Sequence, residues 1–407
     1  MSETVLQRES AVVMQTYRRH SVVFTRGEGV WLFDDEGRRY LDCLAGLAVT
    51  VVGHANPRIR AAVDRQMGTL VHVSNLYYTE PQVLLAERLT ELSGLDQVFF
   101  SNDGATANEC AIKLARRWSQ KRKGPEAFEI VTLDGSFHGR TLATLAATGQ
   151  PSKQATFQPL PAGFRQVPPG DIDALAATMG PNIAAVMIET IQGEGGVIPL
   201  DERYLRSVRH LCDESGVLMI VDDVQAGIGR TGTWFSWQSL GFEPDMATSA
   251  KALANGLPIG VCLARSDVAA AFDYGDHATT FGGGPVICRA ALATLEEVAD
   301  VLPAVAERSE HLRRRLGRLD GVRAVRGRGL FLAAVLDRDR AGEVTARALE
   351  HGLVVNDVRP DTVRFTPPLV ISAAEVDDAV RRFSKALGNS ATGSGQSPAG
   401  PNPSTSP

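Results

Sequence analysis

The spacing of hydrophobic residues divides the first part of the chain into short elements. Residues 1 to about 20 have the spacing of an amphipathic helix, and 57–70 and 81–92 are helical patterns that each begin with proline. Val30 to Asp42 alternates around the turn Asp-Glu-Gly, which predicts a hairpin. Such an arm, placed ahead of the main sheet, is typical of a segment that packs on a partner subunit.

From residue 97 onward, strand-like and helical segments alternate. Val217–Val221 is a continuous apolar run between Gly216 and two aspartates, the pattern of a strand buried on both faces of a parallel sheet. Similar strands are predicted in V-F-F-S, F-E-I-V-T-L, A-A-V-M-I-E-T and P-I-G-V-C-L-A, and helices at 105–118 and 201–215. This order predicts an α/β fold, with helices covering a mostly parallel sheet.

The pattern changes after about residue 284. A long helical stretch over 286–319 leads into two strand-like segments, a helix at 343–351 and a last helix that ends near 387. We therefore expect an N-terminal arm and hairpin (1–50), a large domain (51–285) and a smaller α+β domain (286–387). Residues 388–407 are rich in Gly, Ser and Pro, and we expect them to be disordered.

Composition limits the classes of function. The formal charge of −5 over 407 residues gives no case for nucleic-acid binding, and no apolar run approaches membrane-spanning length. The first residues lack the apolar core of a signal peptide, and the five cysteines form no C-x-x-C pair. We therefore expect a cytoplasmic protein with reduced thiols and without a metal site.

The strongest candidate chemistry lies at the ends of two strands. Asp222 and Asp223 follow the Val217 strand, and Lys251 follows the short buried segment Met246–Ala250. Carboxyl ends of strands form the ligand edge of an open α/β sheet. A lysine that binds an aldehyde and a carboxylate that keeps a pyridine nitrogen protonated suit a pyridoxal phosphate site. The alternatives are a solvated lysine, and aspartates that cap a helix or bind a metal.

Other strand ends add polar groups at the same edge. Gly104 lies at a strand-to-helix turn, where free backbone N–H groups can bind a phosphate. In Ser136–Arg140, Phe137 is a candidate to stack on the cofactor ring, and Arg140 offers a planar fork to a substrate carboxylate. His138 is either a general base or a packing and positioning residue. Glu189 ends the next strand, and Glu194 lies in a glycine-rich turn where it can pair with an arginine.

Seven motifs in one order resemble the class III aminotransferases of fold type I. They are S-N-x-G-x-x-A-N-E, S-F-H-G-R-T, E-x-I-Q-G-E-G-G, V-D-D-V-Q-x-G-x-G-R-T-G, A-K-A-L, T-T-F-G-G and V-R-F-T-P-P-L. The resemblance covers about residues 10–387 and implies a pyridoxal-phosphate-dependent transferase. Within the family, S-N-L-Y-Y-T-E-P-Q, A-T-L-A-A-T-G-Q and G-L-V-V-N-D-V-R-P are most similar to the acetylornithine and ornithine aminotransferases.

The resemblance implies roles for individual residues. Lys251 and Asp222 would be catalytic, with Lys251 bonded to the cofactor aldehyde and later moving the substrate proton, and Asp222 on the pyridinium nitrogen. The remaining implied cofactor contacts are Gln225, Phe137, His138, Gly104, Ala105 and Asp103 from the same chain and Thr280 from a neighbouring subunit. A site built across an interface makes a homodimer the working unit.

The resemblance also implies a substrate pair. The terminal amine of N-acetylornithine, or of a close ω-amino acid, would be transferred to 2-oxoglutarate. Arg140 would bind the α-carboxylate of the donor while Glu194 neutralises Arg364, and Glu194 would swing away when a dicarboxylate arrives. Alternative donors are ornithine, N-succinyl-diaminopimelate, 4-aminobutyrate or a specialised-pathway intermediate. A different alternative is a degenerate homologue that binds but turns over poorly.

Six positions depart from the usual family pattern. Asp103 stands in place of serine or threonine, and its carboxylate either repels the phosphate or simply caps the following helix. The others are Thr106 for glutamate, Thr190 for proline, Asp223 for glutamate, Ala226 for threonine and Gly284 for asparagine. Most of these changes flank cofactor or substrate motifs, so they bear on cofactor affinity and on the identity of the donor.

Overall fold

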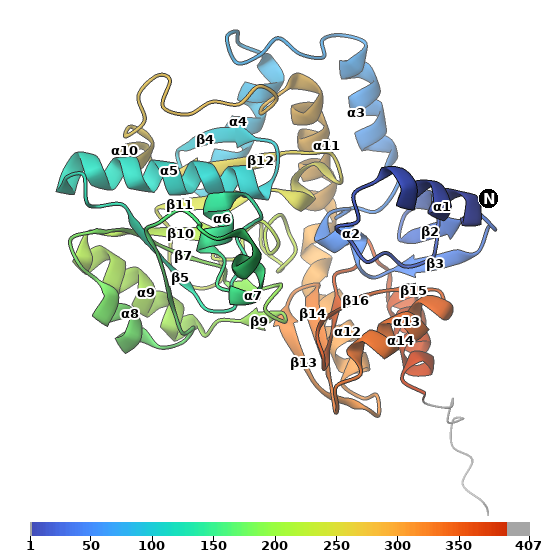
Figure 1. Ribbon diagram of the computed structural model, residues 1–407. Coiled ribbons are helices and arrows are strands. Elements are labelled where there is room, and N and C mark those ends of the chain that lie inside the picture. The colour runs from blue at the N-terminus through green and yellow to red at the C-terminus, as the bar shows by residue number, and fades with distance from the viewer. Residues whose placement is uncertain (1, 389–407) are drawn as a thin grey trace, which may run out of the picture.

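The computed structural model describes residues 2–388, so the tail predicted to be disordered lies, apart from its first residue, outside the described residues. A seven-stranded sheet forms the centre of the molecule (Figure 1). Its strands, in spatial order, are β4 (Gln97–Ser101), β12 (Gly260–Ala264), β11 (Met246–Ser249), β10 (Leu218–Asp222), β7 (Ile183–Ile188), β5 (Glu129–Leu133) and β6 (Phe164–Val167). β12 is antiparallel to β11 and β4, and the other neighbouring pairs are parallel. The predicted mostly parallel α/β sheet is confirmed.

The alternation of side chains along β10 explains why helices cover both faces of this sheet. Leu218 and Ile220 pack in one buried cluster with residues of α5 (Gly104–Lys123), whereas Met219 and Val221 pack in another with residues of α9 (Glu202–Ser215). Figure 1 shows α5 and α9 on opposite sides of the sheet. A strand buried on both faces is expected to be apolar along its length, as β10 is from Leu218 to Val221.

Two smaller sheets flank the central one. The N-terminal sheet contains β1 (Phe24–Glu28), β2 (Trp31–Asp34), β3 (Arg39–Asp42) and β15 (Leu353–Val354), and its β2–β3 pair is the predicted hairpin. The C-terminal sheet is antiparallel, in the order β13 (Val322–Arg328), β14 (Phe331–Leu336), β17 (Thr362–Phe365) and β16 (Asn356–Arg359). The strand β15 thus completes a sheet whose other three strands come from residues 24–42.

The helix predicted over 286–319 is interrupted. It consists of α11 (Pro285–Val301), a 3-10 turn at Leu302–Ala304 and α12 (Val305–Leu316). Pro303 lies in that turn, where it lacks the N–H that would continue the α-helical ladder. The strand β6 and the helix α8 (Ile172–Thr178) were not predicted.

The remaining elements connect these layers. They are α1 (Ser2–Val12), α2 (Ala45–Ala48), α3 (Pro57–Met67), α4 (Glu80–Ser93), α6 (Leu142–Ala147), α7 (Pro151–Gln154), η1 (Ala155–Phe157), β8 (Ile191–Gln192), β9 (Ile198–Pro199), η2 (Lys251–Ala254), α10 (Ser266–Ala269), α13 (Ala341–Glu350) and α14 (Ala373–Ala386). None of the helices within residues 2–388 combines the length and the apolar character needed to cross a bilayer.

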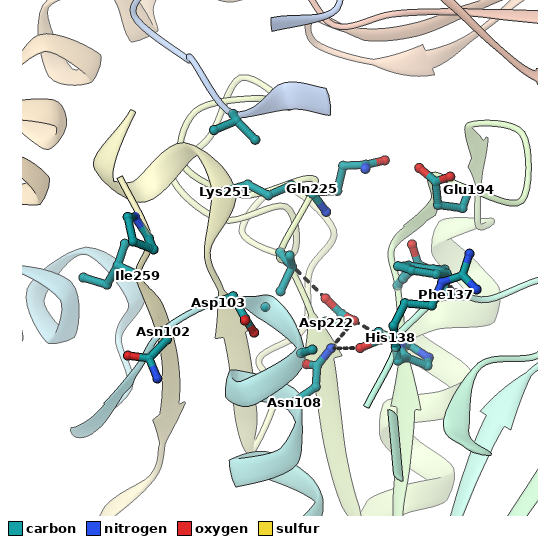
Figure 2. Close-up of a pocket in the computed structure, with 18 of the residues that line it drawn as sticks. Asn102, Asp103, Asn108, Phe137, His138, Glu194, Asp222, Gln225, Lys251 and Ile259 are labelled. Atoms are coloured by element: carbon teal, nitrogen blue, oxygen red, sulfur yellow. Dashed lines mark hydrogen bonds and ion pairs between the residues drawn. The ribbon is translucent and has the colours of Figure 1, made fainter. Parts of the chain in front are cut away.

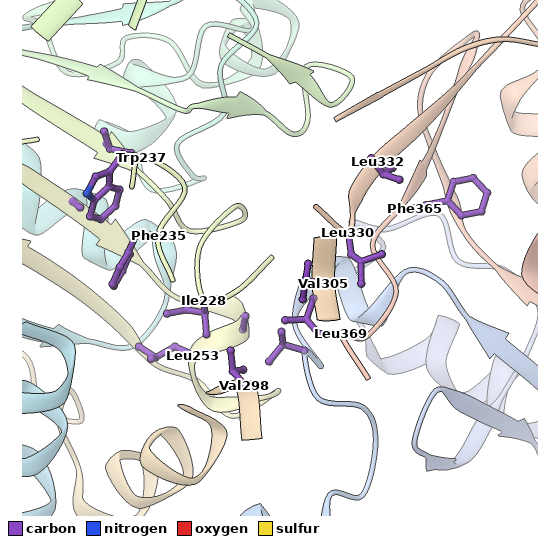
Figure 3. Close-up of a cluster of buried hydrophobic side chains, with 14 of the residues drawn as sticks. Ile228, Phe235, Trp237, Leu253, Val298, Val305, Leu330, Leu332, Phe365 and Leu369 are labelled. Carbon is purple, nitrogen blue, oxygen red and sulfur yellow. The ribbon is translucent and has the colours of Figure 1, made fainter. Parts of the chain in front are cut away.

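One hydrophobic core joins the central and C-terminal sheets. It extends from Phe235 and Trp237, through Val298 of α11, to Leu332 and Phe365 of the C-terminal sheet (Figure 3). All five of these side chains are buried. Because close-packed interiors resist deformation, this core holds the C-terminal sheet in a fixed position against the edge of the central one.

Asp223, which directly follows β10, is a buried carboxylate with few hydrogen-bond partners. Asp223 Oδ2 accepts a 2.9 Å hydrogen bond from Ser236 N, while Oδ1 is buried without a partner among the described residues. The Ser236 hydroxyl is 2.6 Å from Thr190 Oγ1, so two of the departures from the family pattern meet at one serine. Burial raises the pKa of Asp223 from 3.8 to about 7.

This carboxyl group should make stability depend on pH. A pKa that is higher in the folded state means that the stability contributed at low pH is lost as the pH rises from about 4 through about 7. Asp223→Asn removes the ionisation and keeps an acceptor for Ser236 N. We expect the variant to match the wild type near pH 4 and to exceed its unfolding free energy by roughly 1–3 kcal/mol at pH 8. Denaturant titrations at both pH values measure this difference, and an equal difference at both would contradict the explanation.

Candidate active site

The loops that follow the parallel strands surround a cavity of about 390 Å³ (Figure 2). The strands β5, β7, β10 and β11 are mutually parallel neighbours, so their carboxyl ends meet at one edge of the sheet. Ten of the residues predicted as a site line this cavity: Asp103, Gly104, Ala105, Phe137, His138, Arg140, Glu194, Asp222, Gln225 and Lys251.

Lys251 enters the cavity from the end of β11. Its backbone has φ +39°, a left-handed conformation that is rare for a residue with a side chain and is often found at functional sites. Burial lowers the pKa of the Lys251 amine, an effect that the negative charge of Asp222 opposes. Within residues 2–388, the amine makes no hydrogen bond or ion pair. Lys251 therefore presents an amine that loses its proton more easily than a solvated lysine.

Asp222 is held rigidly at the end of β10. Its Oδ2 accepts hydrogen bonds from Asn108 Nδ2 and His138 Nδ1, each at 2.8 Å, and Oδ1 accepts one from Val224 N at 3.1 Å. The dashed lines in Figure 2 trace this arrangement. Such donors fix the orientation of a carboxylate.

The contact with Asp222 bears on the two alternatives for His138. Because the Asp222 carboxylate accepts, His138 Nδ1 carries the proton, and the other ring nitrogen is buried without a partner among the described residues. The geometry favours a positioning residue over a general base. Asn108, which sequence reasoning did not single out, also donates to His138 O at 2.7 Å and accepts from Thr248 Oγ1 at 2.6 Å.

The first turn of α5 forms the other end of the cavity. Asp103 caps this helix: its Oδ1 accepts from Thr106 N at 2.8 Å, and Asp103 N donates to Thr106 Oγ1 at 3.0 Å. This capping box accounts for two of the six departures, since Asp103 and Thr106 serve each other. The N–H groups of Gly104 and Ala105 have no partner within the described residues, and a Cβ on Gly104 would strike Val224. Free N–H groups at a helix N-terminus suit an anion.

Glu189 is a second buried carboxylate of the cavity wall; the sequence placed it at this edge but assigned it no role. Its Oε1 accepts from Phe137 N at 2.8 Å and its Oε2 from Gly193 N at 3.2 Å. Burial raises its pKa to about 7, although the nearby His138 opposes this shift. Glu189 thus ties the segment that carries Phe137 to the turn that carries Glu194.

Arg364, on β17 of the C-terminal sheet, lies behind the cavity wall and contacts two residues that line it, Glu194 and Gln225. It is 1% exposed, and its Nη1 donates to Glu194 Oε1 at 2.6 Å and to Gln225 Oε1 at 3.1 Å. Its Nη2 is buried without a partner among the described residues. Burial would raise the pKa of Glu194, but the charge and the hydrogen bond of Arg364 outweigh this effect and lower it. The pair is therefore ionised at neutral pH, with one guanidinium nitrogen left to bind an anion.

Arg140 lines the cavity, whereas Thr280 does not. The exposed Arg140 guanidinium lies 5.6 Å from the centre of the Phe137 ring and makes no ion pair within residues 2–388. Thr280 is exposed and lines a neighbouring groove, so the structure of one chain does not bring it to the cavity. Its predicted contact concerns a neighbouring subunit.

The last two departures lie in different surroundings. Ala226 is buried in a small apolar cluster with Ile191, Val197 and Phe331, where a hydroxyl group would need a partner. Gly284 precedes Pro285 at the start of α11 and contributes no side-chain cap.

No group of three or more His, Cys, Asp or Glu side chains that could hold a metal occurs in the described part of the chain.

Similarity to known proteins agrees with this geometry. The family described as "Aminotransferase class-III" matches residues 12–387. The acetylornithine aminotransferase of Gloeobacter violaceus is 50% identical over 93% of this chain and 96% of its own length. That of Methanocaldococcus jannaschii is 44% identical over 92% and 96%.

Solved structures agree in fold. The ornithine aminotransferase from Toxoplasma gondii superposes with a TM-score of 0.91 at 31% identity, covering 95% of each chain. The N-acetylornithine aminotransferase from Stenotrophomonas maltophilia gives 0.81 at 36% identity, covering 94% of this chain and 98% of that one. A cavity that gathers a partly buried lysine, an anchored aspartate and a helix end with free N–H groups suits this chemistry, and the chain belongs to the class III aminotransferases, which depend on pyridoxal phosphate.

Proposed function

We propose that this enzyme transfers the terminal amino group of N-acetylornithine, or of a close ω-amino acid, to 2-oxoglutarate. The observation that carries the proposal is a pair of arginines, with Arg140 on the cavity wall and Arg364 behind it in contact with Glu194. Arg140 is free to bind a carboxylate, while Arg364 is neutralised by Glu194. The acetylornithine aminotransferases similar to this chain support the choice of donor.

The residues of the cavity fit pyridoxal phosphate. In this proposal the free N–H groups of Gly104 and Ala105 hold the phosphate, Phe137 packs on the ring, Gln225 lies near the ring hydroxyl and Asp222 binds the ring nitrogen. When bound, the cofactor supplies an aldehyde that reacts with amines and a ring that withdraws electrons from the substrate carbon. Asp103 is engaged in its cap, so its carboxylate is not free to swing toward the phosphate.

Lys251 and Asp222 perform different tasks. Because burial lowers the pKa of Lys251, a larger share of its amine is unprotonated at neutral pH and able to form a bond to an aldehyde. The same Nζ atom then takes and returns the proton of the substrate carbon. Asp222 keeps a proton on the ring nitrogen, and Asn108 and His138 keep the carboxylate in place.

The two arginines distinguish the two substrates. An ω-amino donor has one carboxylate, which Arg140 binds, and Glu194 neutralises the competing cation, Arg364. 2-Oxoglutarate has two carboxylates, so Glu194 has to turn away to let Arg364 bind the one near the reacting carbon. The unpartnered Nη2 of Arg364 gives that carboxylate a second donor.

A second copy of the chain completes the site in this proposal. Leu76 (85% exposed) lines the groove that contains Thr280, and Tyr78 (99%) and Phe281 (68%), which are close to these residues in the sequence, are also exposed. Exposed large apolar side chains of this kind are typical of protein–protein interfaces. A symmetric dimer through this face would cover these side chains and carry Thr280 to the partner's phosphate.

A panel of donors tests the reaction. With 2-oxoglutarate as acceptor, we expect kcat/KM for N-acetylornithine to exceed that for ornithine, 4-aminobutyrate and N-succinyl-diaminopimelate by about tenfold or more. Acetylation removes the α-ammonium charge, which would otherwise lie close to the Arg140 cation. Glutamate formation is the measurement. Lys251→Ala serves as the control and should abolish turnover and the visible absorption of the bound cofactor. A higher kcat/KM for another donor would replace N-acetylornithine in the proposal.

Glu194→Ala tests the substrate switch. The variant leaves Arg364 free to bind the donor carboxylate in the wrong orientation, so kcat/KM for N-acetylornithine should fall by about tenfold, with glutamate spared or improved. Steady-state kinetics in each direction give both values. Glu194→Gln keeps the size of the side chain without its charge and should lie in between. Equal losses for both substrates would rule out the switch.

Tyr78→Asp tests the interface. This side chain is almost fully exposed in one chain, so the change should not disturb folding, but a carboxylate buried between two copies should weaken the dimer. We expect a concentration-dependent shift to monomer in analytical ultracentrifugation, with activity lost in parallel. Phe157→Asp changes an exposed aromatic (54%) outside this surface and is the matched control. A fully active monomeric Tyr78→Asp enzyme would refute the shared site.

A further inference from the structure

Glu194 lies at the tip of a hairpin whose backbone is tightly held. We call residues 193–197 the gate turn; β8 and β9 flank it, and Gly196 N and Val197 N both donate to Gly193 O, at 3.2 and 3.1 Å. On the side of the central sheet, Gly193 N donates to Glu189 Oε2 at 3.2 Å. One end of the gate turn is therefore anchored next to the cavity.

The other end of the gate turn is anchored by an arginine that does not line the cavity. Arg326, on β13, donates from Nε to Gly196 O at 2.9 Å and from Nη2 to Thr362 Oγ1 at 3.3 Å. Thr362 lies on β17, two residues before Arg364. One guanidinium thus connects the backbone that carries Glu194 to the strand that carries Arg364. In Figure 1, β9 lies beside β13, where this contact is made.

The space around this anchor is filled. A Cβ on Gly196 would come within 2.8 Å of Arg326 Nη2 and of Arg359 Cδ, and the φ of Gly196 is +115°. Burial lowers the pKa of Arg326, and the nearby Arg359 adds to this effect, so the guanidinium is partly desolvated and its hydrogen bonds are correspondingly strong. Glu194 itself keeps 31% of its side chain exposed. The side chain has room to rotate, whereas the backbone beneath it does not.

We propose that Arg326 is a positioning residue for the substrate switch: by bridging Gly196 O and Thr362 Oγ1, it sets the distance at which Glu194 meets Arg364. The inference rests on the proposed function of Glu194. Without the two hydrogen bonds of Arg326, only the Glu194–Arg364 ion pair itself joins the gate turn to β17 within the described residues, and we expect this ion pair to weaken. If the ion pair is weaker, a dicarboxylate displaces Glu194 from Arg364 more easily. Arg364 is then also less well neutralised when the ω-amino donor binds.

Arg326→Met tests the proposal, with Arg328→Met as the matched control. Arg328 lies on the same strand, is also partly buried, and donates to Leu200 O at 2.8 Å, at the far end of the same hairpin. The measured quantity is kcat/KM for N-acetylornithine divided by that for glutamate. We expect Arg326→Met to lower this ratio by roughly three- to tenfold, the range for one net hydrogen bond, and Arg328→Met to leave it unchanged. An unchanged ratio in Arg326→Met, or equal changes in both variants, would overturn the inference.

Binding of glutarate, a dicarboxylate without an amino or keto group, gives a readout that does not depend on turnover. Calorimetry should show tighter binding of glutarate to Arg326→Met than to the wild type and the control, and equal binding would count against the bridge. Arg326→Lys keeps the charge and one hydrogen bond, so it should give an intermediate change. If Arg326→Met does not fold, Arg326→Lys serves as the test variant.

A double variant separates this inference from the proposal beneath it. If Arg326 acts through Glu194, adding Arg326→Met to Glu194→Ala should change the substrate ratio no further. A further change of the same size as in the single variant would show an independent role and overturn the inference. If Glu194→Ala alone leaves the ratio unchanged, the substrate switch itself fails. If Glu194→Ala shifts the ratio and Arg326→Met does not, the switch stands and only the role of Arg326 fails.

Discussion

The anchoring of one buried carboxylate, Asp222, determines how the rest of the site is arranged. A carboxylate that is removed from water costs several kcal/mol unless donors replace its hydration. Here the donors come from α5, through Asn108, and from the loop after β5, through His138. Asn108 also binds Thr248 on β11, the strand that leads to Lys251. The same hydrogen-bond network therefore positions the helix end that can bind a phosphate, the segment around Phe137 and the strand before the lysine.

Two buried carboxylates, Asp222 and Glu189, line the cavity and a third, Asp223, lies behind it; the three differ in their hydrogen-bond donors. Within the described part of the chain, Asp222 accepts three hydrogen bonds, Glu189 two backbone N–H groups and Asp223 the N–H of Ser236. Burial raises the pKa of Glu189 and of Asp223 to about 7. Asp222 thus has the most donors of the three. In the proposed function it serves the ring nitrogen of the cofactor, while Glu189 and Asp223 hold backbone segments in place.

The central sheet could be predicted from the sequence because its strands are buried on both faces and therefore appear as unbroken apolar runs. The sequence also placed Lys251 and Asp222 at one edge, since both follow such runs. Asn108 and Arg326 could not be found in this way, because their partners lie far away in the sequence and are brought close only by packing. Glu189 was placed at this edge as the end of a strand, but its contacts with Phe137 N and Gly193 N could not be predicted. The capping box of Asp103 and Thr106 is different. Its spacing is local, so the interpretation of Asp103 as a helix cap was within reach of the sequence, whereas the break at Pro303 was overlooked although proline signals it.

The two sheets that supply Lys251 and Arg364 are joined by one continuous core, which constrains how a single cavity can accept two unlike substrates. Close-packed side chains between Trp237 and Phe365 leave little freedom for one sheet to move against the other (Figure 3). The backbone of the gate turn is likewise held, at Gly193 by Glu189 and at Gly196 by Arg326. What remains free is the Glu194 side chain, which is partly exposed and bound chiefly through its charge. A charge that can rotate on a fixed backbone can therefore alter the pocket without any rearrangement of the fold.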